Sequence, residues 1–143
     1  MSLENEAAVE AACIRLQQRY GTLADRQDPK FRALFSPDAV ITLPDYPPFA
    51  GLGAIMQGQA DWKTSGAVMH HICTNHTIDV AGADRAMGIC YLMVFRATEP
   101  SLAAGSPYPI GPISVGEFHD EFVRVEGRWL FKSRTLHWRF RTA

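Results

Sequence analysis

Cysteine is scarce in this sequence of 143 residues, which contains only Cys13, Cys73 and Cys90. Three scattered thiols are too few for a disulfide framework, and their spacing fits no zinc-binding motif. We therefore expect three buried free thiols in a reducing cytoplasm.

An excess of charge is also missing, because 14 Lys and Arg residues balance 15 Asp and Glu residues to a net charge of −1. The composition therefore gives no reason to expect nucleic acid or anionic lipid as a partner. No window approaches the ~18 uninterrupted apolar residues of a membrane span. The first ten residues, MSLENEAAVE, do not resemble a secretion signal. We expect a cytoplasmic protein with no membrane partner.

The sequence has no internal repeat and no low-complexity tract. With 47% apolar and 20% charged residues, it has the composition of an ordinary globular protein. A chain of this length can bury one core but hardly two. We therefore expect residues 1–143 to form a single domain.

The first half of the chain predicts helices. Apolar residues recur at intervals of four, three, four and three from Val9 to Leu23, which is the stripe of an amphipathic helix extending from about Leu3 to Asp25. Asp28 and Pro29 are typical of an N-cap and a first helical residue. The expected elements are then a short helix through Leu34 and Phe35, a strand at Ala39–Leu43, a proline-rich loop outside the sheet at Pro44–Gly51, and a helix at Leu52–Ser65.

The second half predicts four consecutive strands, at Met69–Val80, Arg85–Thr98, Ile113–Val125 and Arg128–Arg141. The connection Glu99–Pro112 is longer than an ordinary hairpin loop, so we interpret it as a functional flap or rim. Helices followed by long antiparallel strands predict an α+β fold, with the helices packed on one face of a curved sheet.

Three of the five histidines lie in the predicted strand VMHHICTNHTID, residues 68–79. Successive side chains of a strand point to opposite faces, so His70 and His71 cannot face the same side. Regular alternation would place Asn75 with His71, and His76 with His70. A shift of one residue in register would exchange the two adjacent histidines.

The histidines do not predict a metal site. His70 and His76 would share a face, but roughly 20 Å of strand would separate them, which is too far for one ion. We interpret His119 and His137 as structural. Arg134 would face away from Arg139 and Arg141, so these three indicate a solvated strand or the edge of a dimer.

Three stretches carry a family resemblance: LADRQDPKFRALFSPDAV, HHICTN and VGEFHDEFVRVEGRWLFKSR. Together with the order of helices and strands, they resemble the SnoaL-like branch of the nuclear-transport-factor-2-like superfamily over nearly the whole chain. The resemblance implies a cone-shaped fold, in which a strongly bent sheet and N-terminal helices enclose a deep apolar pocket.

Within that branch the chain is most similar to scytalone dehydratases, lindane dehydrochlorinases and bile-acid dehydratases. These enzymes pair an aspartate at the end of the first helix with a histidine on the first long strand, which implies Asp25 and His71 here. Bile-acid dehydratases also have a tyrosine that matches Tyr20. Helical periodicity alone turns Asp25 roughly 140° from Tyr20. Its inward placement is therefore implied by the resemblance only.

The chain also departs from the pattern of scytalone dehydratase. Arg96 stands where that enzyme has a second histidine, and Ala24 stands where it has a tyrosine before the aspartate. The aspartate–histidine pair therefore carries over, but the rest of the site and its substrate do not.

The resemblance implies a cofactor-independent, dehydratase-like lyase acting on a small cyclic, largely apolar molecule of polyketide or steroid type. His71 would remove a proton from carbon, and Asp25 would stabilise the imidazolium. Tyr20 would polarise a carbonyl or assist a leaving hydroxyl, and Arg96 would stabilise a developing oxyanion. The expected substrate-binding residues are Asn75, Arg96, Tyr46, Trp62 and Phe118.

Two alternatives stay open at this point. The same pair could catalyse isomerisation or cyclisation, because these reactions also begin with removal of a proton. The chain could instead be a non-catalytic ligand-binding or assembly subunit, like the β subunit of aromatic-ring dioxygenases, with side chains filling its pocket. We further expect a homodimer or homotrimer that covers the exposed face of the sheet.

Overall fold

A computed structural model describes residues 1–142 of the chain. Its elements are α1 (Leu3–Asp25), η1 (Pro29–Leu34), β1 (Phe35–Thr42), β2 (Phe49–Ala50), α2 (Leu52–Ser65), β3 (Met69–Val80), β4 (Arg85–Arg96), β5 (Ile113–Val125) and β6 (Arg128–Phe140). The order confirms the predicted α+β class. In the described part of the chain, no helix is long and apolar enough to cross a membrane.

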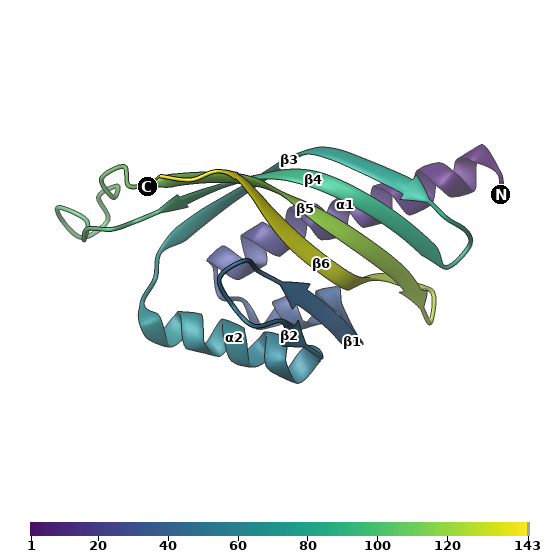
Figure 1. Ribbon diagram of the computed structural model, residues 1–143, viewed down its shortest axis with the longest axis horizontal. Coiled ribbons are helices and arrows are strands. Elements are labelled where there is room, and N and C mark those ends of the chain that lie inside the picture. The colour runs from purple at the N-terminus through teal and green to yellow at the C-terminus, as the bar shows by residue number, and fades with distance from the viewer. Residues whose placement is uncertain (143) are drawn as a thin grey trace.

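The six strands form one sheet in the order β2-β1-β6-β5-β4-β3. Strands β3 to β6 are antiparallel neighbours, whereas β1 runs parallel to β6. The sheet is therefore mixed rather than purely antiparallel. Figure 1 shows it curving over α1, with α2 on the far side of β1 and β2. This is the expected cone, in which helices and a bent sheet enclose the interior.

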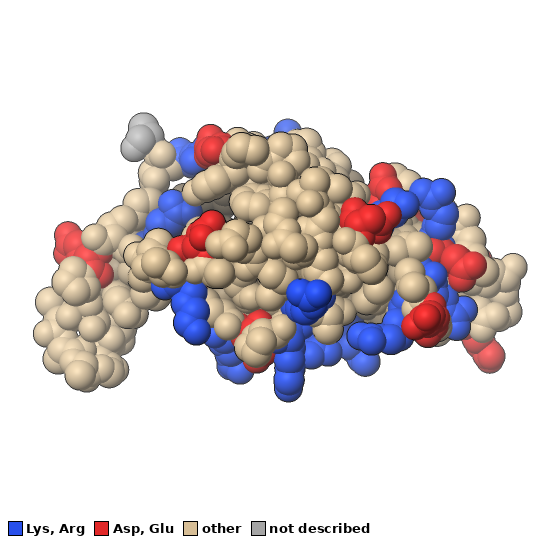
Figure 2. All heavy atoms as spheres, turned by 90° about the horizontal axis from the view of Figure 1, so that it is seen from below, with Lys and Arg blue, Asp and Glu red and all other residues tan. Residues whose placement is uncertain are grey.

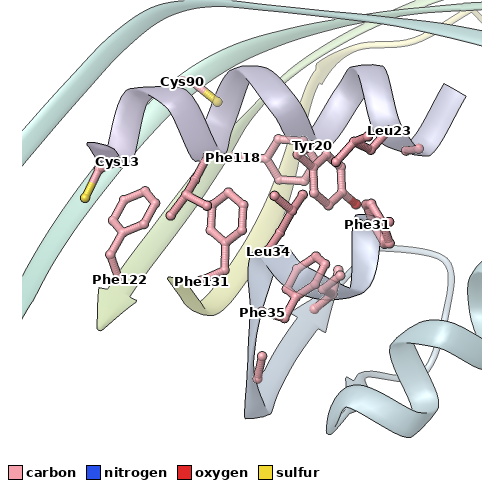
Figure 3. Packing of buried hydrophobic residues seen from close by; sticks show 14 of the residues in the cluster. Cys13, Tyr20, Leu23, Phe31, Leu34, Phe35, Cys90, Phe118, Phe122 and Phe131 are labelled. Atoms are coloured by element: carbon pink, nitrogen blue, oxygen red, sulfur yellow. The ribbon is translucent and has the colours of Figure 1, made fainter. Parts of the chain in front are cut away.

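Helix α1 begins where the sequence predicts. Its N-cap Ser2 accepts a hydrogen bond from the backbone N–H of Asn5, and Glu4 and Glu6 lie in the first turn, where they favour the positive end of the helix dipole. The apolar stripe is buried, as expected. Figure 3 shows Tyr20 of α1 beside Phe118 and Phe131 of the sheet, so this stripe forms much of the core.

Two boundaries in the first half differ from the prediction. Strand β1 starts at Phe35 rather than Ala39, and a register shift between Phe35 and Val40 accommodates Pro37 in the strand. The segment Pro44–Gly51 also contains β2, where Phe49 pairs with Ile41. The short strand β2 ends the sheet, where proline-rich flanks are tolerated because few ladder bonds are needed.

Strand β3 contains an irregularity that regular alternation did not predict. Its ladder with β4 shifts register between Thr74 and Thr77, and Asn75 has a φ of 51°. This is a β-bulge, and asparagine is one of the few residues that adopts the left-handed conformation readily.

The bulge corrects two predictions about faces. Asn75 is exposed and does not share the inner face of His71. His76 shares the inner face of His71 rather than the outer face of His70, because the extra residue inverts the alternation.

Both the mixture of surface charges and the free thiols were expected from the composition. Figure 2 shows acidic and basic side chains interspersed, with basic ones gathered along one long edge of the view. All three cysteines are free thiols, and Cys73 is only partly buried.

Candidate active site

Asp25, the last residue of α1, contacts His71 of β3 through both carboxylate oxygens. Oδ2 accepts a hydrogen bond of 2.8 Å from the backbone N–H of His71, and Oδ1 is in hydrogen-bond contact with Nδ1 of the ring. The two side chains are 12% and 6% exposed, whereas that of His70 is 77% exposed. His71, not His70, is therefore the inward-facing histidine of the pair.

This contact determines which ring nitrogen carries the proton in the neutral imidazole of His71. A carboxylate can only accept hydrogen bonds, so Nδ1 of His71 carries the ring proton and Nε2 keeps its lone pair. The second bond, from the backbone of His71, holds the carboxylate in place. Such a histidine can accept a proton at Nε2, and Asp25 would stabilise the cation that forms.

Close approach of α1 to β3 at Gly21 places the carboxylate. A Cβ on Gly21 would lie 3.0 Å from Cβ of His71. Asp25 lies four residues after Gly21 and therefore shares its helix face, as does Gln17 four residues before it. Gln17 also meets β3, because its Oε1 lies 2.8 Å from Nδ1 of His76. The face of Gln17, Gly21 and Asp25 thus follows β3, while Tyr20 points into the core.

Two cavities, of about 190 Å³ and about 210 Å³, lie inside the cone. They adjoin, because Tyr20, Leu43, Tyr46 and Trp62 line both. The smaller cavity lies between α1, β1 and α2, and the larger is bounded by the sheet and contains His71. The wall of the smaller cavity is mostly apolar and aromatic, which suits a largely apolar ligand, whereas Asp45, His71, Arg96 and Arg141 make the wall of the larger one more polar.

The structure places most of the predicted pocket residues around these cavities. Tyr20 and Trp62 have their ring centroids 6.5 Å and 6.3 Å from that of His71. Phe118 and Arg96 line the cavity that contains His71. Tyr46 is 55% exposed and lies at the opening of both cavities. Asn75 lines neither of them, because the bulge turns it outward.

Burial raises the pKa of Tyr20 to about 12, although the guanidinium of Arg134 lowers it in part. That guanidinium lies 4.3 Å from the centroid of the Tyr20 ring. The hydroxyl therefore stays protonated at any ordinary pH and can donate a hydrogen bond into the cavities that it lines.

Arg134 corrects the prediction of a solvated strand or dimer edge. It is fully buried, and its Nε and Nη2 donate to the two carboxylate oxygens of Asp120 at 2.7 Å and 3.0 Å. Its guanidinium also lies over the rings of Tyr20, Phe118 and Phe131. The guanidinium of this ion pair therefore packs against Tyr20 and Phe118, which line the larger cavity.

The polar network continues from this ion pair to β3. Gln17 donates from Nε2 to Asp120 at 2.9 Å and accepts at Oε1 from Nδ1 of His76. Burial lowers the pKa of His76 below its ordinary value, and the nearby charge of Arg134 lowers it further. His76 is therefore neutral at physiological pH and acts as a hydrogen-bond donor in this network.

Three further predictions concern residues away from the cavities. The segment Glu99–Pro112 projects beyond the end of the sheet, and none of its residues lines either cavity (Figure 1). His119 and His137 pack edge to face with ring centroids 4.5 Å apart, and both are exposed. Within residues 1–142, no group of three or more His, Cys, Asp or Glu residues could hold a metal ion.

Comparison with known proteins identifies a family and several solved structures with a similar fold. The model of the SnoaL-like domain matches residues 5–135. No curated protein sequence matches the chain. Among solved structures, a proposed scytalone dehydratase from Novosphingobium aromaticivorans is 22% identical, with a TM-score of 0.79 over 99% of this chain and 91% of that one.

Two other structures are similar. A hexachlorocyclohexane dehydrochlorinase from Novosphingobium barchaimii LL02 is 17% identical, with a TM-score of 0.81 over 99% of this chain and 93% of that one. A protein of unknown function from Mycobacterium tuberculosis is 25% identical, with a TM-score of 0.77 over 97% of this chain and 77% of that one. Identities this low show a shared fold and leave the chemistry to be argued from the site.

Proposed function

The chain belongs to the SnoaL-like domain family, and from this premise we propose that it is a cofactor-independent lyase of the dehydratase type. Its substrate would be a small cyclic, largely apolar molecule of polyketide or steroid type. The observation that supports this proposal most is the contact between Asp25 and His71 at the wall of a cavity that adjoins an apolar one. Paired ionisable groups in a cleft are typical of active sites.

In the proposed reaction, Nε2 of His71 takes a proton from a carbon atom of the substrate. The electron pair of that C–H bond forms a carbon–carbon double bond as the neighbouring C–O bond breaks. The hydroxyl takes the proton back from the imidazolium of His71 and departs as water, and Asp25 stabilises that imidazolium while it exists. Tyr20 donates a hydrogen bond to a carbonyl or to the leaving hydroxyl, for which its protonated state is required.

Two similar structures are consistent with this class of reaction. A dehydratase removes water and a dehydrochlorinase removes hydrogen chloride, so each must break a C–H bond next to a leaving group. Isomerisation or cyclisation by the same pair would share the proton removal but would retain all atoms of the substrate. The mass of the product therefore distinguishes elimination from these alternatives.

A non-catalytic assembly subunit is the less favoured function. That function predicts a pocket filled with side chains, whereas side chains leave two cavities unfilled in this chain. It also gives no reason to bury a carboxylate against an imidazole, since such groups lose solvation when they are buried.

The test uses a panel of cyclic β-hydroxy ketones and halogenated cycloalkanes, with product formation followed by mass spectrometry. We expect His71→Gln and Asp25→Asn to lower turnover by roughly 10²- to 10⁴-fold, which is the usual contribution of a general base. His137→Gln is the matched control, because His137 is exposed and lines neither cavity, and should retain activity. Full turnover by both His71→Gln and Asp25→Asn would contradict the mechanism.

We also propose that the chain acts as one domain and associates into a homodimer or homotrimer. Ile72, Met87 and Tyr91 on the outer face of the sheet are 38%, 57% and 48% exposed, and such faces usually need covering. Light scattering should give a mass above that of one chain. A monomer at micromolar concentration would contradict this proposal.

A further inference from the structure

Three basic side chains, His71, Arg96 and Arg141, line the larger cavity. Two of them already contact a carboxylate of the chain. His71 contacts Asp25, and Nη2 of Arg141 lies 3.0 Å from Oδ2 of Asp45. Arg96 differs, because its Nη2 meets only the sulfur of Met69, at 3.7 Å, and no carboxylate among residues 1–142 pairs with it. The cavity therefore contains one cation whose counter-charge the described residues do not supply.

The position of Arg96 relative to His71 follows from the register of β3 and β4. Leu92, Val94 and Arg96 share the inner face of β4, and the first two are 1% and 5% exposed. Val94 pairs with His71, whereas Arg96 pairs with Met69. The backbone of Arg96 therefore lies two residues beyond that of His71 along the strands, or about 7 Å.

This geometry gives the cavity two chemically different ends. Leu92, Phe118 and Leu136 line its buried end, and the exposed Arg96 stands at its opposite end. The imidazole of His71, which is paired with Asp25, lies between these ends, because His71 pairs with Val94, and Val94 stands between Leu92 and Arg96 on the inner face of β4. A ligand that fits both ends must have an apolar body and one anionic group.

We propose that the substrate carries a carboxylate, which Arg96 binds at the open end of the cavity while His71 acts on the apolar body. The planar guanidinium presents paired N–H donors that match the two oxygens of a carboxylate. This inference rests on the proposed function and specifies its substrate class. It also assigns Arg96 to substrate binding rather than to stabilisation of an oxyanion, because the oxyanion would form next to the carbon that His71 deprotonates.

The test compares binding of matched ligands without turnover. Each pair is a cyclic carboxylate and its neutral amide: benzoate and benzamide, 2-naphthoate and 2-naphthamide, and a steroid carboxylate and its amide. Isothermal titration calorimetry gives the affinity of each ligand for the full chain. We expect at least one carboxylate to bind roughly 10- to 100-fold more tightly than its amide, as is usual for hydrogen bonds to a charged group.

Substitution localises the preference. Arg96→Met should remove the difference between carboxylate and amide while retaining affinity for the amide, which also shows that the cavity has stayed intact. Arg96→Lys should keep part of the preference. Arg85→Met is the matched control, because Arg85 is exposed at the other end of β4, and should bind like the original chain.

A second group of basic side chains could also bind a carboxylate, so the Arg96→Met variant is needed to show where the ligand binds. Arg15, Arg19, Lys30 and Arg128 line a separate groove between α1, η1 and β6. A carboxylate bound in that groove would keep its preference in Arg96→Met. Such a result would overturn the proposal, as would a panel in which no carboxylate binds more tightly than its amide.

The outcome is also separable from that of the proposed function. A carboxylate preference without elimination activity would contradict the proposed lyase alone. Elimination activity on neutral substrates without any carboxylate preference would contradict the role of Arg96 alone.

Discussion

Gly21 of α1 lies directly against His71 of β3. A Cβ on Gly21 would be 3.0 Å from Cβ of His71, which is tighter than ordinary contact, and 3.4 Å from the carbonyl oxygen of His71. One helical turn later, Asp25 reaches the imidazole of the same histidine. The absence of a side chain at Gly21 therefore sets how closely the carboxylate approaches the ring.

We predict that Gly21→Ala pushes α1 away from β3 and lengthens the contact between Asp25 and His71. A displacement of 1 Å in a catalytic group can lower the rate by about 10²-fold. We expect a decrease of at least 10-fold in kcat/KM, together with a changed ¹⁵N shift of Nδ1 of His71.

The matched control for this prediction is Gly53→Ala, because Gly53 lies in α2 and a Cβ there would meet nothing within 4 Å. It should raise stability by about 0.5–1 kcal/mol, since alanine favours a helix over glycine, and leave activity unchanged. Unaltered kinetics in Gly21→Ala would show that the helix can shift without moving the carboxylate.

Tyr20→Phe should lower activity while the fold is retained, because the ring packing against Phe31 and Phe118 does not use the hydroxyl. Since burial raises the pKa of Tyr20 to about 12, its hydroxyl stays protonated well above neutral pH. The ratio of the two rates should therefore be the same at about pH 7 and about pH 9. A ratio that falls toward one at the higher pH would mean that Tyr20 ionises earlier than its burial implies.

His76 should make the stability of the protein depend on pH. Its pKa is lowered in the folded chain, chiefly by burial, so the unfolded chain binds the proton more readily as the pH falls below about 6.5. Stability from this group is therefore present above about pH 6.5 and is lost as the pH decreases through the folded pKa.

His76→Gln removes this titration, so the melting temperature of the variant should decrease less between about pH 7 and about pH 5. His137→Gln serves as the comparison, because His137 is exposed. An equal pH dependence in His76→Gln and the original chain would contradict the prediction.

Breaking the ion pair of Asp120 and Arg134 should be costly, because both side chains are 0% exposed and the remaining charge would be buried alone. Asp120→Asn should lower the free energy of unfolding by roughly 3–5 kcal/mol, as measured by urea denaturation. The double variant Asp120→Leu with Arg134→Met leaves no buried charge, so its loss should be smaller than that of Asp120→Asn.

A surface ion pair gives the baseline for that measurement. Asp45 contacts Arg141 at 3.0 Å, and the two side chains are 60% and 49% exposed. Asp45→Asn should change stability by less than about 1 kcal/mol. If Asp120→Asn cost no more than this substitution, the buried pair would be better solvated than its position indicates.

Sequence patterns were sufficient for the elements that are periodic and capped. Both α1 (Leu3–Asp25) and α2 (Leu52–Ser65) have the predicted bounds, because their apolar spacing and termini are local properties. The strands of the second half also begin where expected. The inward placement of Asp25 was different, since it depends on Gly21 meeting β3, and helical periodicity contains no information about that contact.

The polar network was missed because two bulges changed the side chains that face each other. The left-handed conformation of Asn75 brought His76 to the inner face, and a strand pattern with a period of two cannot represent it. The ladder between β5 and β6 also shifts register, between Glu121 and Phe122, and this shift pairs Asp120 with Arg134. A ladder that continued from the hairpin without the shift would pair Asp120 with Ser133. An arginine without a visible partner in sequence is ordinarily assigned to the surface.

The bulge at Asn75 also affects how copies of the chain can aggregate. Strand β3 ends the sheet, and an uninterrupted strand of that length would offer its free backbone groups to a strand of another molecule. The register shift divides β3 into two short segments with opposite side-chain phase. No neighbouring strand can pair with both segments in one continuous register, so the same irregularity that turns His76 inward also protects the sheet against edge-to-edge polymerisation.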